Sequence, residues 1–424
     1  MRRVVVTGMG AVTPLSSNVA RSWEKLVSGK SGIRTTAGFE ISDLTSRVSG
    51  QIIRREYGFT DVSEDDFFIP NNYLDEKEQK RVDDFIIYAL AAATEAMNDS
   101  GISKDDSDFE QIGTVIGSGI GGLDEIYNTS VTLSEKGPRR VSPFFIPSCL
   151  INLAAGMVSI KFGFNGPNLS VVTACASGTH SIGESYNLIR NGYTDVIFAG
   201  AAEGAVCRLG VSGFASIKSL STHFNDTPLI ASRPWDKDRD GFVISEGAGI
   251  LVLEELEHAK KRGAKIYGEV VGYGLSGDAY HITAPHHESK GAILSMNMAL
   301  KDAKISPDQI DYINAHGTST PIGDLVELNA VQKIFGNDQS VTMSSTKSST
   351  GHALGAAGAM EAVFCLKALN SGIVPPTLNL YSQPDGNKVD LVPHKSKEKA
   401  LNYVISNSFG FGGTNASIIF KKFS

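Results

Sequence analysis

The sequence predicts an α/β fold of stacked layers that is built from two similar halves. Apolar runs of strand length alternate with helical patterns along the chain, which is typical of layered α/β proteins. The run at 267–273 resembles the N-terminal run at 3–7, and the run at 416–421 resembles the one at 249–253. Such self-similarity indicates an internal duplication. We therefore divide the chain into an N-terminal half, 1–264, and a C-terminal half, 265–424.

The composition predicts a soluble protein of the reducing cytoplasm. Four cysteines, none in a C-x-x-C pair, are too few and too scattered for a disulfide framework. The net charge of −7 argues against a general nucleic-acid partner, because a phosphate backbone needs a basic face. No apolar run reaches the roughly 18 residues of a membrane span. The N-terminal run breaks at Thr7-Gly8, so we expect neither a membrane segment nor a signal peptide.

Two glycine motifs of the N-terminal half imitate a dinucleotide-binding fingerprint. The first follows the strand at 3–7, but Pro14 stands where the phosphate-binding helix should begin. The second is a literal G-x-G-x-x-G at 117–122, after a strand at 112–116, and no acidic residue occupies the position that recognises ribose. We attribute this second motif to tight packing near the core.

A helical pattern over 75–98 lies between these two strands. Its first turns carry one basic stripe, formed by Lys77, Lys80 and Arg81. A loop further on adds Arg139-Arg140. Taken alone, a stripe of this kind is usually only a solvated face.

The central stretch of the chain is 169–192, where an apolar run stops at Cys175 and a helical pattern begins. We interpret 169–173 as a buried strand and the following pattern as a helix that ends at Asn191-Gly192. The positive end of that helix would favour a thiolate at Cys175, and the small residues around it would leave the sulfur accessible. The alternative, an inert buried cysteine, has about the same support from this stretch alone.

Two more strands close the N-terminal half. The strand at 195–200 completes a β-α-β unit with the helix after Cys175, which predicts parallel pairing. The strand at 247–255 is followed by a charged helix at 256–262.

The C-terminal half places two histidines at the ends of elements, each beside a glycine. An apolar strand at 310–315 ends in His316, and a Ser/Thr-rich segment ends in His352 before a helix at 353–369 that is apolar on nearly every side. Strand-end residues of an α/β core converge on a site. His180 is expected to pack or hydrogen-bond on its helix, and the other histidines receive no role: His223, His258, His281, His286, His287 and His394.

One cysteine and two histidines at element ends are compatible with three chemistries. A cysteine hydrolase would use one histidine as a base. A zinc site would need ligand spacings that these widely separated residues lack. Carbon–carbon bond formation needs a nucleophile that holds an acyl group and two neutral donors that stabilise an enolate oxygen, and the two-histidine arrangement suits it best.

Four blocks hold most of these polar residues. They are Thr-Ala-Cys-Ala-Ser-Gly at 173–178, His-Gly-Thr-Ser-Thr-Pro-Ile-Gly-Asp at 316–324, Lys-Ser-Ser-Thr-Gly-His at 347–352 and Asn-Ser-Phe-Gly-Phe-Gly-Gly-Thr-Asn at 407–415. Their sequences and order resemble the β-ketoacyl-acyl carrier protein synthases of the thiolase superfamily, above all the elongating enzymes of dissociated bacterial fatty acid synthesis. The similarity spans 4–420 and implies a thiolase-like fold with αβαβα layers from two duplicated halves.

The resemblance implies a catalytic role for five residues. Cys175 would accept an acyl chain from the phosphopantetheine of acyl carrier protein, and neutral His316 and His352 would bind the thioester oxygen of malonyl-carrier protein as CO2 leaves. The backbone N–H groups of Cys175 and Phe411 would form an oxyanion hole, and Phe411 would gate the site. Lys347 would support the His352 region electrostatically, although a plain salt bridge is the alternative.

Further residues match the family's substrate positions. Thr318 and Thr320 would bond the pantetheine arm, Phe214 and Phe409 would contact substrate, and Ile120 would line the acyl pocket or simply pack. No cofactor is required, because decarboxylation supplies the driving force. Glu361 would bind either a monovalent cation together with carbonyls near Asn314 and Ala315, or a protein hydrogen-bond partner.

The resemblance gives the basic residues a partner, the strongly acidic acyl carrier protein. The matching docking positions are Lys77, Lys80, Arg81, Arg139, Arg140 and Lys218. Relatives in this family form homodimers, so we expect one here. Alternatives are a polyketide-type ketosynthase, a catalytically silent chain-length partner, which would lack the nucleophile, and a Cys/His hydrolase.

Overall fold

The computed structural model describes residues 1–104, 107–336 and 341–423. Within these residues the main sheet has the strand order β10-β9-β13-β14-β8-β1-β7-β6-β4-β5. The N-terminal half supplies β1 (Val4–Val12), β4 (Ile112–Gly117), β5 (Asn168–Leu169), β6 (Val196–Glu203) and β7 (Gly247–Glu255). The C-terminal half supplies β8 (Gly268–Gly277), β9 (Tyr312–Asn314), β10 (Thr342–Ser344), β13 (Tyr403–Gly410) and β14 (Thr414–Lys421).

Both halves arrange their five strands in the same way. In the N-terminal half β4 pairs parallel with β5 and β6, and β7 pairs antiparallel with β6 and β1. In the C-terminal half β9 pairs parallel with β10 and β13 in the same way, and β14 pairs antiparallel with β13 and β8. The halves meet where β1 pairs with β8, with Val4 opposite Val270. The repeated order confirms the predicted duplication. The limit at 264/265 falls between α9 (Leu256–Lys261) and β8, and as a domain boundary it stays a prediction.

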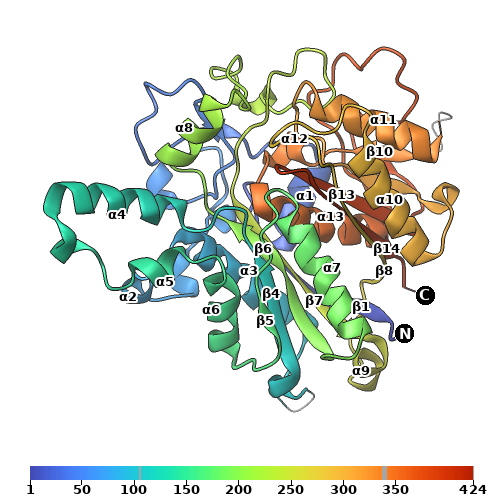
Figure 1. Cartoon of the computed structure of the whole chain (residues 1–424), viewed down its shortest axis with the longest axis horizontal. Coiled ribbons are helices and arrows are strands. Elements are labelled where there is room, and N and C mark those ends of the chain that lie inside the picture. The colour runs from blue at the N-terminus through green and yellow to red at the C-terminus, as the bar shows by residue number, and fades with distance from the viewer. Residues whose placement is uncertain (105–106, 337–340, 424) are drawn as a thin grey trace.

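Helices form three layers around these strands (Figure 1). The outer layer of the N-terminal half contains α3 (Asp84–Ser100) and α6 (Leu153–Phe162). Two buried helices, α7 (Ser177–Arg190) and α13 (Ala357–Ser371), each contact strands of both halves. The outer layer of the C-terminal half contains α10 (Lys290–Ala303), against which α11 (Gly323–Phe335) packs. This is the predicted αβαβα order.

The two buried helices touch through glycines. A Cβ atom at Gly178 of α7 would lie 2.6 Å from the amide nitrogen of Ala359, and one at Gly358 of α13 would lie 2.1 Å from Thr179 Oγ1. No side chain fits at either contact, so the helices approach to backbone distance. This contact fixes the starts of both helices, where the reactive side chains are held.

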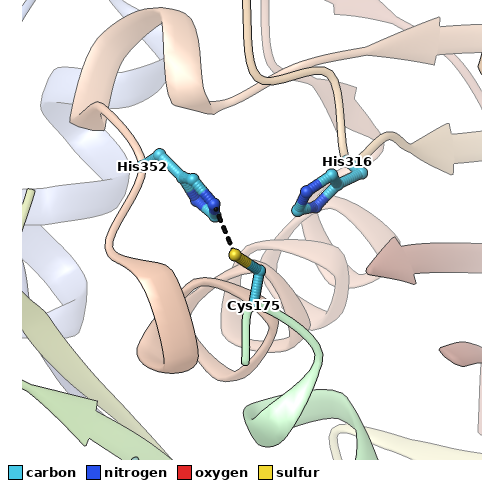
Figure 2. Close-up of side chains that lie close together, drawn as sticks. All are labelled: Cys175, His316 and His352. Carbon is cyan, nitrogen blue, oxygen red and sulfur yellow. Dashed lines mark hydrogen bonds between the residues drawn. The ribbon is translucent and has the colours of Figure 1, made fainter. Parts of the chain in front are cut away.

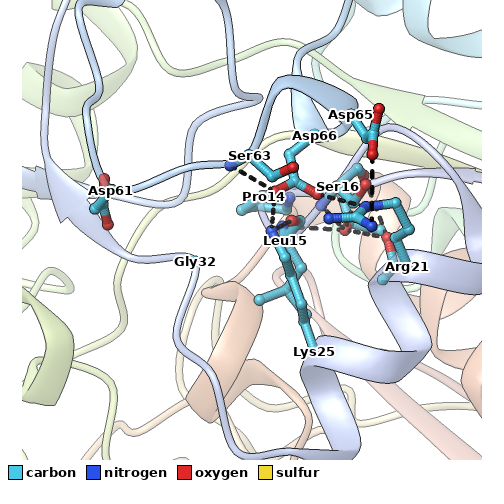
Figure 3. Close-up of polar contacts among 12 residues, drawn as sticks. Pro14, Leu15, Ser16, Arg21, Lys25, Gly32, Asp61, Ser63, Asp65 and Asp66 are labelled. Carbon is cyan, nitrogen blue, oxygen red and sulfur yellow. Dashed lines mark hydrogen bonds and ion pairs between the residues drawn. The ribbon is translucent and has the colours of Figure 1, made fainter.

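The N-terminal half carries an insertion at 13–83, between β1 and α3, where the C-terminal half has only 278–289 between β8 and α10. The insertion contains α1 (Val19–Val27), the paired strands β2 (Arg34–Thr35) and β3 (Val48–Ser49), and α2 (Glu76–Gln79). Buried Asp66 ties α1 to the segment at 63–66 within this insertion, as Figure 3 shows. Arg21 Nε donates to this carboxylate at 2.9 Å, Lys25 Nζ at 2.5 Å and the Ser63 amide at 3.0 Å.

The remaining elements are short or peripheral. They are α4 (Leu123–Lys136), α5 (Phe145–Cys149), α8 (Arg208–Ser216), α12 (Lys347–Thr350) and the pair β11 (Ile373–Val374) and β12 (Lys397–Glu398). Among the described residues, no helix has both the length and the apolar character needed to cross a membrane.

Two predicted elements differ from the structure. The helix expected at 75–98 is two helices, because the Asp75 side chain caps α2 and the Asp83 side chain caps α3. The strand expected at 169–173 is reduced to the exposed pair Asn168–Leu169. It is not buried because β5 is the edge strand of the sheet, so no further strand covers it.

Candidate active site

Cys175 lies in the tight turn that leads into α7. The residue before it, Ala174, has a φ of +50°, a conformation that non-glycine residues rarely adopt. Ser177 locks the turn, because its Oγ donates to the Ala174 carbonyl at 2.7 Å and accepts from the Thr173 amide at 2.9 Å. The nucleophile therefore has a fixed direction at the N-terminal end of a buried helix.

The Cys175 thiol is less acidic than the sequence predicts. Its side chain is only 8% exposed, and burial raises its pKa to about 12, although the Lys347 charge and the N–H groups of Phe411 and Cys175 act against this rise. Loss of water outweighs the helix dipole, so the buried site does not favour the predicted thiolate, and the sulfur is reached through the cavity that Cys175 lines. The same two N–H groups are those expected to form an oxyanion hole, and they face the sulfur.

Both predicted histidines reach this sulfur (Figure 2). His352 Nε2 lies 3.0 Å from Cys175 Sγ, and the rings of His316 and His352 stand nearly perpendicular, with centroids 5.2 Å apart. The sulfur and one nitrogen from each ring all lie within 4.8 Å of one another. On sequence alone, the wide separation of these three residues argues against a zinc site. The structure brings their ligand atoms together, so that argument does not hold.

Both imidazoles are neutral at physiological pH. Burial lowers the pKa of His316 and of His352 well below its usual value, and the Lys347 charge lowers both further. Neither Nδ1 atom has a hydrogen-bond partner among the described residues. Because no described residue fixes the tautomer through Nδ1, each Nε2 can accept a proton or donate one.

A buried carboxylate that sequence reasoning missed holds the backbone at His316. Glu327 of α11 accepts from the His316 amide at 2.9 Å and from the Gly317 amide at 2.7 Å. Burial raises its pKa to about 7 despite these donors. The available sequence signal was an acidic residue among the apolar residues Val326, Leu328, Ala330 and Val331 of a helix.

Lys347 forms a buried ion pair with Glu361, and its charge also lowers the pKa of both catalytic histidines. Both of the roles considered for Lys347 are therefore present. One Glu361 oxygen contacts Lys347, and the other has no hydrogen-bond partner among the described residues. Asn314 and Ala315, the other predicted cation neighbours, are fully buried.

The three reactive side chains open into a cavity of about 350 Å³. Its lining includes these predicted substrate and gating residues: Phe214, Thr318, Thr320, Phe409 and Phe411. The Thr318 and Thr320 hydroxyls are 3.0 Å apart, and the Phe411 ring lies 6.4 Å from the Phe214 ring. Ile120, the other predicted substrate residue, is not in the lining but packs against the apolar cluster that contains Cys175. His286, to which we assigned no role, also lines the cavity.

The predicted docking residues occupy the surface. Lys77, Lys80, Arg139, Arg140 and Lys218 are exposed, Arg81 is half-buried, and none of the six has an ion-pair partner in the described part of the chain. The Arg81 guanidinium lies over the Phe144 ring at 4.5 Å, which joins the stripe to α5. Lys218 lies at the rim of the cavity itself.

Comparison with known proteins identifies the family to which this chain is similar. A family model described as "Beta-ketoacyl synthase, N-terminal domain" matches residues 1–259, and one described as "Beta-ketoacyl synthase, C-terminal domain" matches 267–381. A relative from Rhizobium meliloti named 3-oxoacyl-[acyl-carrier-protein] synthase 2 is 53% identical over 100% of both chains. One of the same name from Vibrio harveyi is 48% identical over 99% of both chains.

Solved structures agree with this assignment. A beta-ketoacyl synthase from Burkholderia phymatum has a TM-score of 0.88 and 34% identity over 100% of both chains. A type II PKS ketosynthase, solved in complex with its acyl-carrier protein, has a TM-score of 0.89 and 32% identity over 100% of both chains. The chain belongs to the beta-ketoacyl synthase family, with the thiolase-like fold.

Proposed function

We propose that this protein elongates fatty acyl chains by decarboxylative Claisen condensation on acyl carrier protein. The observation that carries the proposal is the meeting of one thiol and two neutral imidazoles in a single cavity. The relatives named 3-oxoacyl-[acyl-carrier-protein] synthase 2 support the reaction class.

In the first half-reaction, Cys175 takes the acyl group. Its Sγ attacks the thioester carbonyl while His352 Nε2, 3.0 Å away, accepts the thiol proton. The oxyanion of the intermediate is bound by the amides of Cys175 and Phe411. When the intermediate collapses, His352 returns the proton to the leaving pantetheine sulfur. A thiol with a pKa of about 12 needs such a base, since few thiolates form unaided.

In the second half-reaction, malonyl-carrier protein loses CO2. The electrons of the broken C–C bond form an enolate, and His316 and His352 each donate an N–H to its oxygen. The enolate carbon attacks the acyl-Cys175 carbonyl, and the sulfur leaves as a thiolate that takes up a proton. The product is a β-ketoacyl chain two carbons longer, held on the carrier protein.

The chemistry needs no redox cofactor, since loss of CO2 drives bond formation. A monovalent cation beside Glu361 would fit the unpartnered oxygen of that buried carboxylate, and the buried Asn314 amide group likewise has no hydrogen-bond partner among the described residues. The contribution of the cation would be to stabilise the negative charge of Glu361. The location we propose is the cytoplasm, where the four free cysteines stay reduced.

The competing functions are less well supported. Identity to the 3-oxoacyl-[acyl-carrier-protein] synthase 2 of Rhizobium meliloti is 53%, against 32% to the type II PKS ketosynthase. A silent chain-length partner would lack the nucleophile that Cys175 supplies. A hydrolase would use one histidine, whereas here both rings face the sulfur (Figure 2).

Intact mass spectrometry with acyl- and malonyl-carrier protein tests the proposal. The wild type and Cys149→Ala, a control at another free cysteine, should become acylated and then release β-ketoacyl product and CO2. Cys175→Ala should show no acylation. Free fatty acid without CO2 would instead support hydrolysis.

The acidic carrier protein and a second copy of this chain are the partners we propose. The basic stripe and Lys218 at the cavity rim would receive the carrier.

Self-association would cover an apolar face on α5, α6 and β5, where Ile146 is 57%, Ile160 72% and Leu169 49% exposed. A mass measurement in solution should give two chains, and Ile160→Asp with Leu169→Asp should give one.

A further inference from the structure

A second buried carboxylate lies beside the nucleophile and takes no part in the proposed chemistry. Glu203 ends β6 and is 0% exposed. Four donors surround it: Ser118 Oγ at 2.8 Å, Gly119 N at 2.8 Å, Ile120 N at 3.2 Å and Gly355 N at 2.9 Å. Three of these donors are backbone N–H groups, which cannot accept a carboxyl proton, and all four favour the anion against burial, which raises the pKa of Glu203.

These donors come from two loops that each contribute a residue to the apolar cluster around Cys175. One is the loop after β4, which presents Ile120, and the other is the turn directly after His352, which presents Leu354. Leu354 lines the cavity and has a φ of +48°, a strained conformation that persists only where its surroundings enforce it. The next residue, Gly355, is anchored to Glu203 through its amide.

Glycines in both loops let the backbone pack closely against this carboxylate. A Cβ atom at Gly119 would lie 2.8 Å from Glu203 Oε2, and one at Gly355 would lie 2.2 Å from the Gly119 amide nitrogen. The G-x-G-x-x-G motif therefore does bind an anion through its backbone, but the anion is a side chain of the same protein. This agrees with its assignment to tight packing.

We propose that Glu203 is a positioning residue that clamps the Ile120 loop to the Leu354 turn and keeps a fixed negative charge near the nucleophile. The first role would set how well acyl chains of different length fit, and it rests on the proposed acyl transfer to Cys175. The second role is independent of that function. In support, the Glu203 charge acts to raise the pKa of the Cys175 thiol.

The charge is tested with two alkylating reagents of similar size, neutral iodoacetamide and anionic iodoacetate. The ratio of their rates at Cys175 reports the local field, because changes in thiolate fraction and in access cancel. Glu203→Gln should raise the iodoacetate-to-iodoacetamide ratio roughly threefold or more, since an anion no longer repels the anionic reagent. Glu203→Asp, which keeps the charge, should leave the ratio at the wild-type value.

A control for the loss of a buried glutamate is Glu246→Gln. Glu246 is 4% exposed, and its carboxylate accepts from the Ile52 amide and the Tyr88 hydroxyl rather than from a loop of the site. Burial raises the pKa of Glu246 to about 8, so the reagents are compared above this pH, where its carboxyl group is charged. Glu246→Gln should leave the reagent ratio unchanged. An equal rise in the Glu246 and Glu203 variants would overturn the assigned charge effect.

The clamp is tested by the acylation of Cys175 from acyl-pantetheines with a short and a long saturated chain, followed by intact mass. In Glu203→Gln, two of the four donors lose their acceptor, so the long-to-short rate ratio should change by roughly tenfold. Ser118→Ala removes one donor and should change the ratio in the same direction by less, which keeps the test decisive if Glu203→Gln does not fold.

Three results separate the failures. If wild type is never acylated, the proposed function fails, whereas the reagent ratio still tests the Glu203 charge. If wild type is acylated but Glu203→Gln and Ser118→Ala keep the wild-type length ratio, the clamp is wrong. If the reagent ratio does not rise in Glu203→Gln, the fixed charge is wrong.

Discussion

The two halves share one strand arrangement but divide the chemistry between them. The N-terminal half supplies the nucleophile, Cys175, and the C-terminal half supplies His316, His352 and Lys347. One device is common to both. In each half, backbone amides that follow the second strand bind a buried glutamate. The amides after β4 bind Glu203, and those after β9 bind Glu327. The comparison teaches that the duplicated backbone was kept while the reactive side chains diverged, and that each half draws its glutamate from a different element, β6 or α11.

The halves also differ in what surrounds the strands. Only the N-terminal half has the insertion at 13–83, which carries the Asp66 cluster and the basic stripe. Variants in the C-terminal core should therefore alter chemistry and core stability. Variants in the insertion should alter the stability of the insertion itself and the recognition of the carrier protein.

The largest expected effect is on the buried ion pair of the C-terminal half. Lys347→Met leaves Glu361 as an unpaired buried carboxylate and should cost about 3–5 kcal/mol of unfolding free energy. Burial raises the pKa of Glu361 to about 7, and Lys347 opposes that rise. A raised carboxyl pKa removes stability as pH rises from the unfolded value of about 4.3, so the loss should be larger at about pH 8 than at about pH 5.

Urea unfolding at both pH values measures this loss. The double variant Lys347→Met/Glu361→Gln should regain most of the stability, because no charge is then left buried. An equal loss at both pH values would show that Glu361 is not the group responsible.

The division of labour is tested most directly by His316→Ala. This variant should acylate Cys175 within a few-fold of the wild-type rate, because His352 is the base at 3.0 Å. Loss of one enolate donor should slow condensation roughly 10²–10³-fold, about 2.7–4 kcal/mol. Mass spectrometry follows the first step and β-ketoacyl product the second. Equal slowing of both steps would contradict the division.

Asp66→Asn should loosen the insertion without affecting the site. Burial raises the pKa of Asp66, but hydrogen bonds from Arg21 and Lys25 outweigh this and leave the pKa below its usual value. A lowered carboxyl pKa contributes stability above the unfolded value, about 3.9, which is lost as pH falls through the folded value. The variant should lose about 1–2 kcal/mol near pH 7.

The same comparison near pH 3 should show a smaller difference between Asp66→Asn and wild type, by thermal or urea unfolding. Asp65→Asn is the control, since its carboxylate is exposed and lies 3.9 Å from Arg21. A difference that does not depend on pH would assign the effect to packing instead of charge.

The smallest effect concerns the basic stripe. Lys80→Glu with Arg81→Glu should raise the KM for carrier-bound acyl groups roughly 3- to 10-fold at low salt and leave acyl-pantetheine unchanged. The control is the same charge change in the other half, Lys301→Glu with Lys304→Glu on exposed parts of α10 and its end. If both pairs raise KM equally, net charge rather than the stripe governs docking.

The sequence was sufficient for the fold class, the duplication and the convergence of Cys175, His316 and His352. Motifs at strand ends made this possible, because the ends of parallel strands meet. The break in the helix at 75–98 was missed, since a capping role for Asp83 becomes visible only once the chain turns there. The raised pKa of Cys175 depends on burial by distant segments, which no local pattern records.

Glu203 and Glu327 could not be assigned from sequence for a related reason. Most of their partners are backbone N–H groups, which every residue except proline carries, so no residue pattern marks the contact. The only available sign was an acidic residue at the end of the apolar strand β6 or on the inner face of α11.

The glycine contact between α7 and α13 makes the enzyme sensitive to alignment across its two halves. The sulfur is held at the start of one helix and His352 shortly before the other, and neither Gly178 nor Gly358 leaves room for a side chain of its own. An added methyl group there would widen the gap that the thiol proton must cross. Turnover should therefore fail under mild denaturation before helical structure is lost, so that activity is a finer measure of this alignment than circular dichroism.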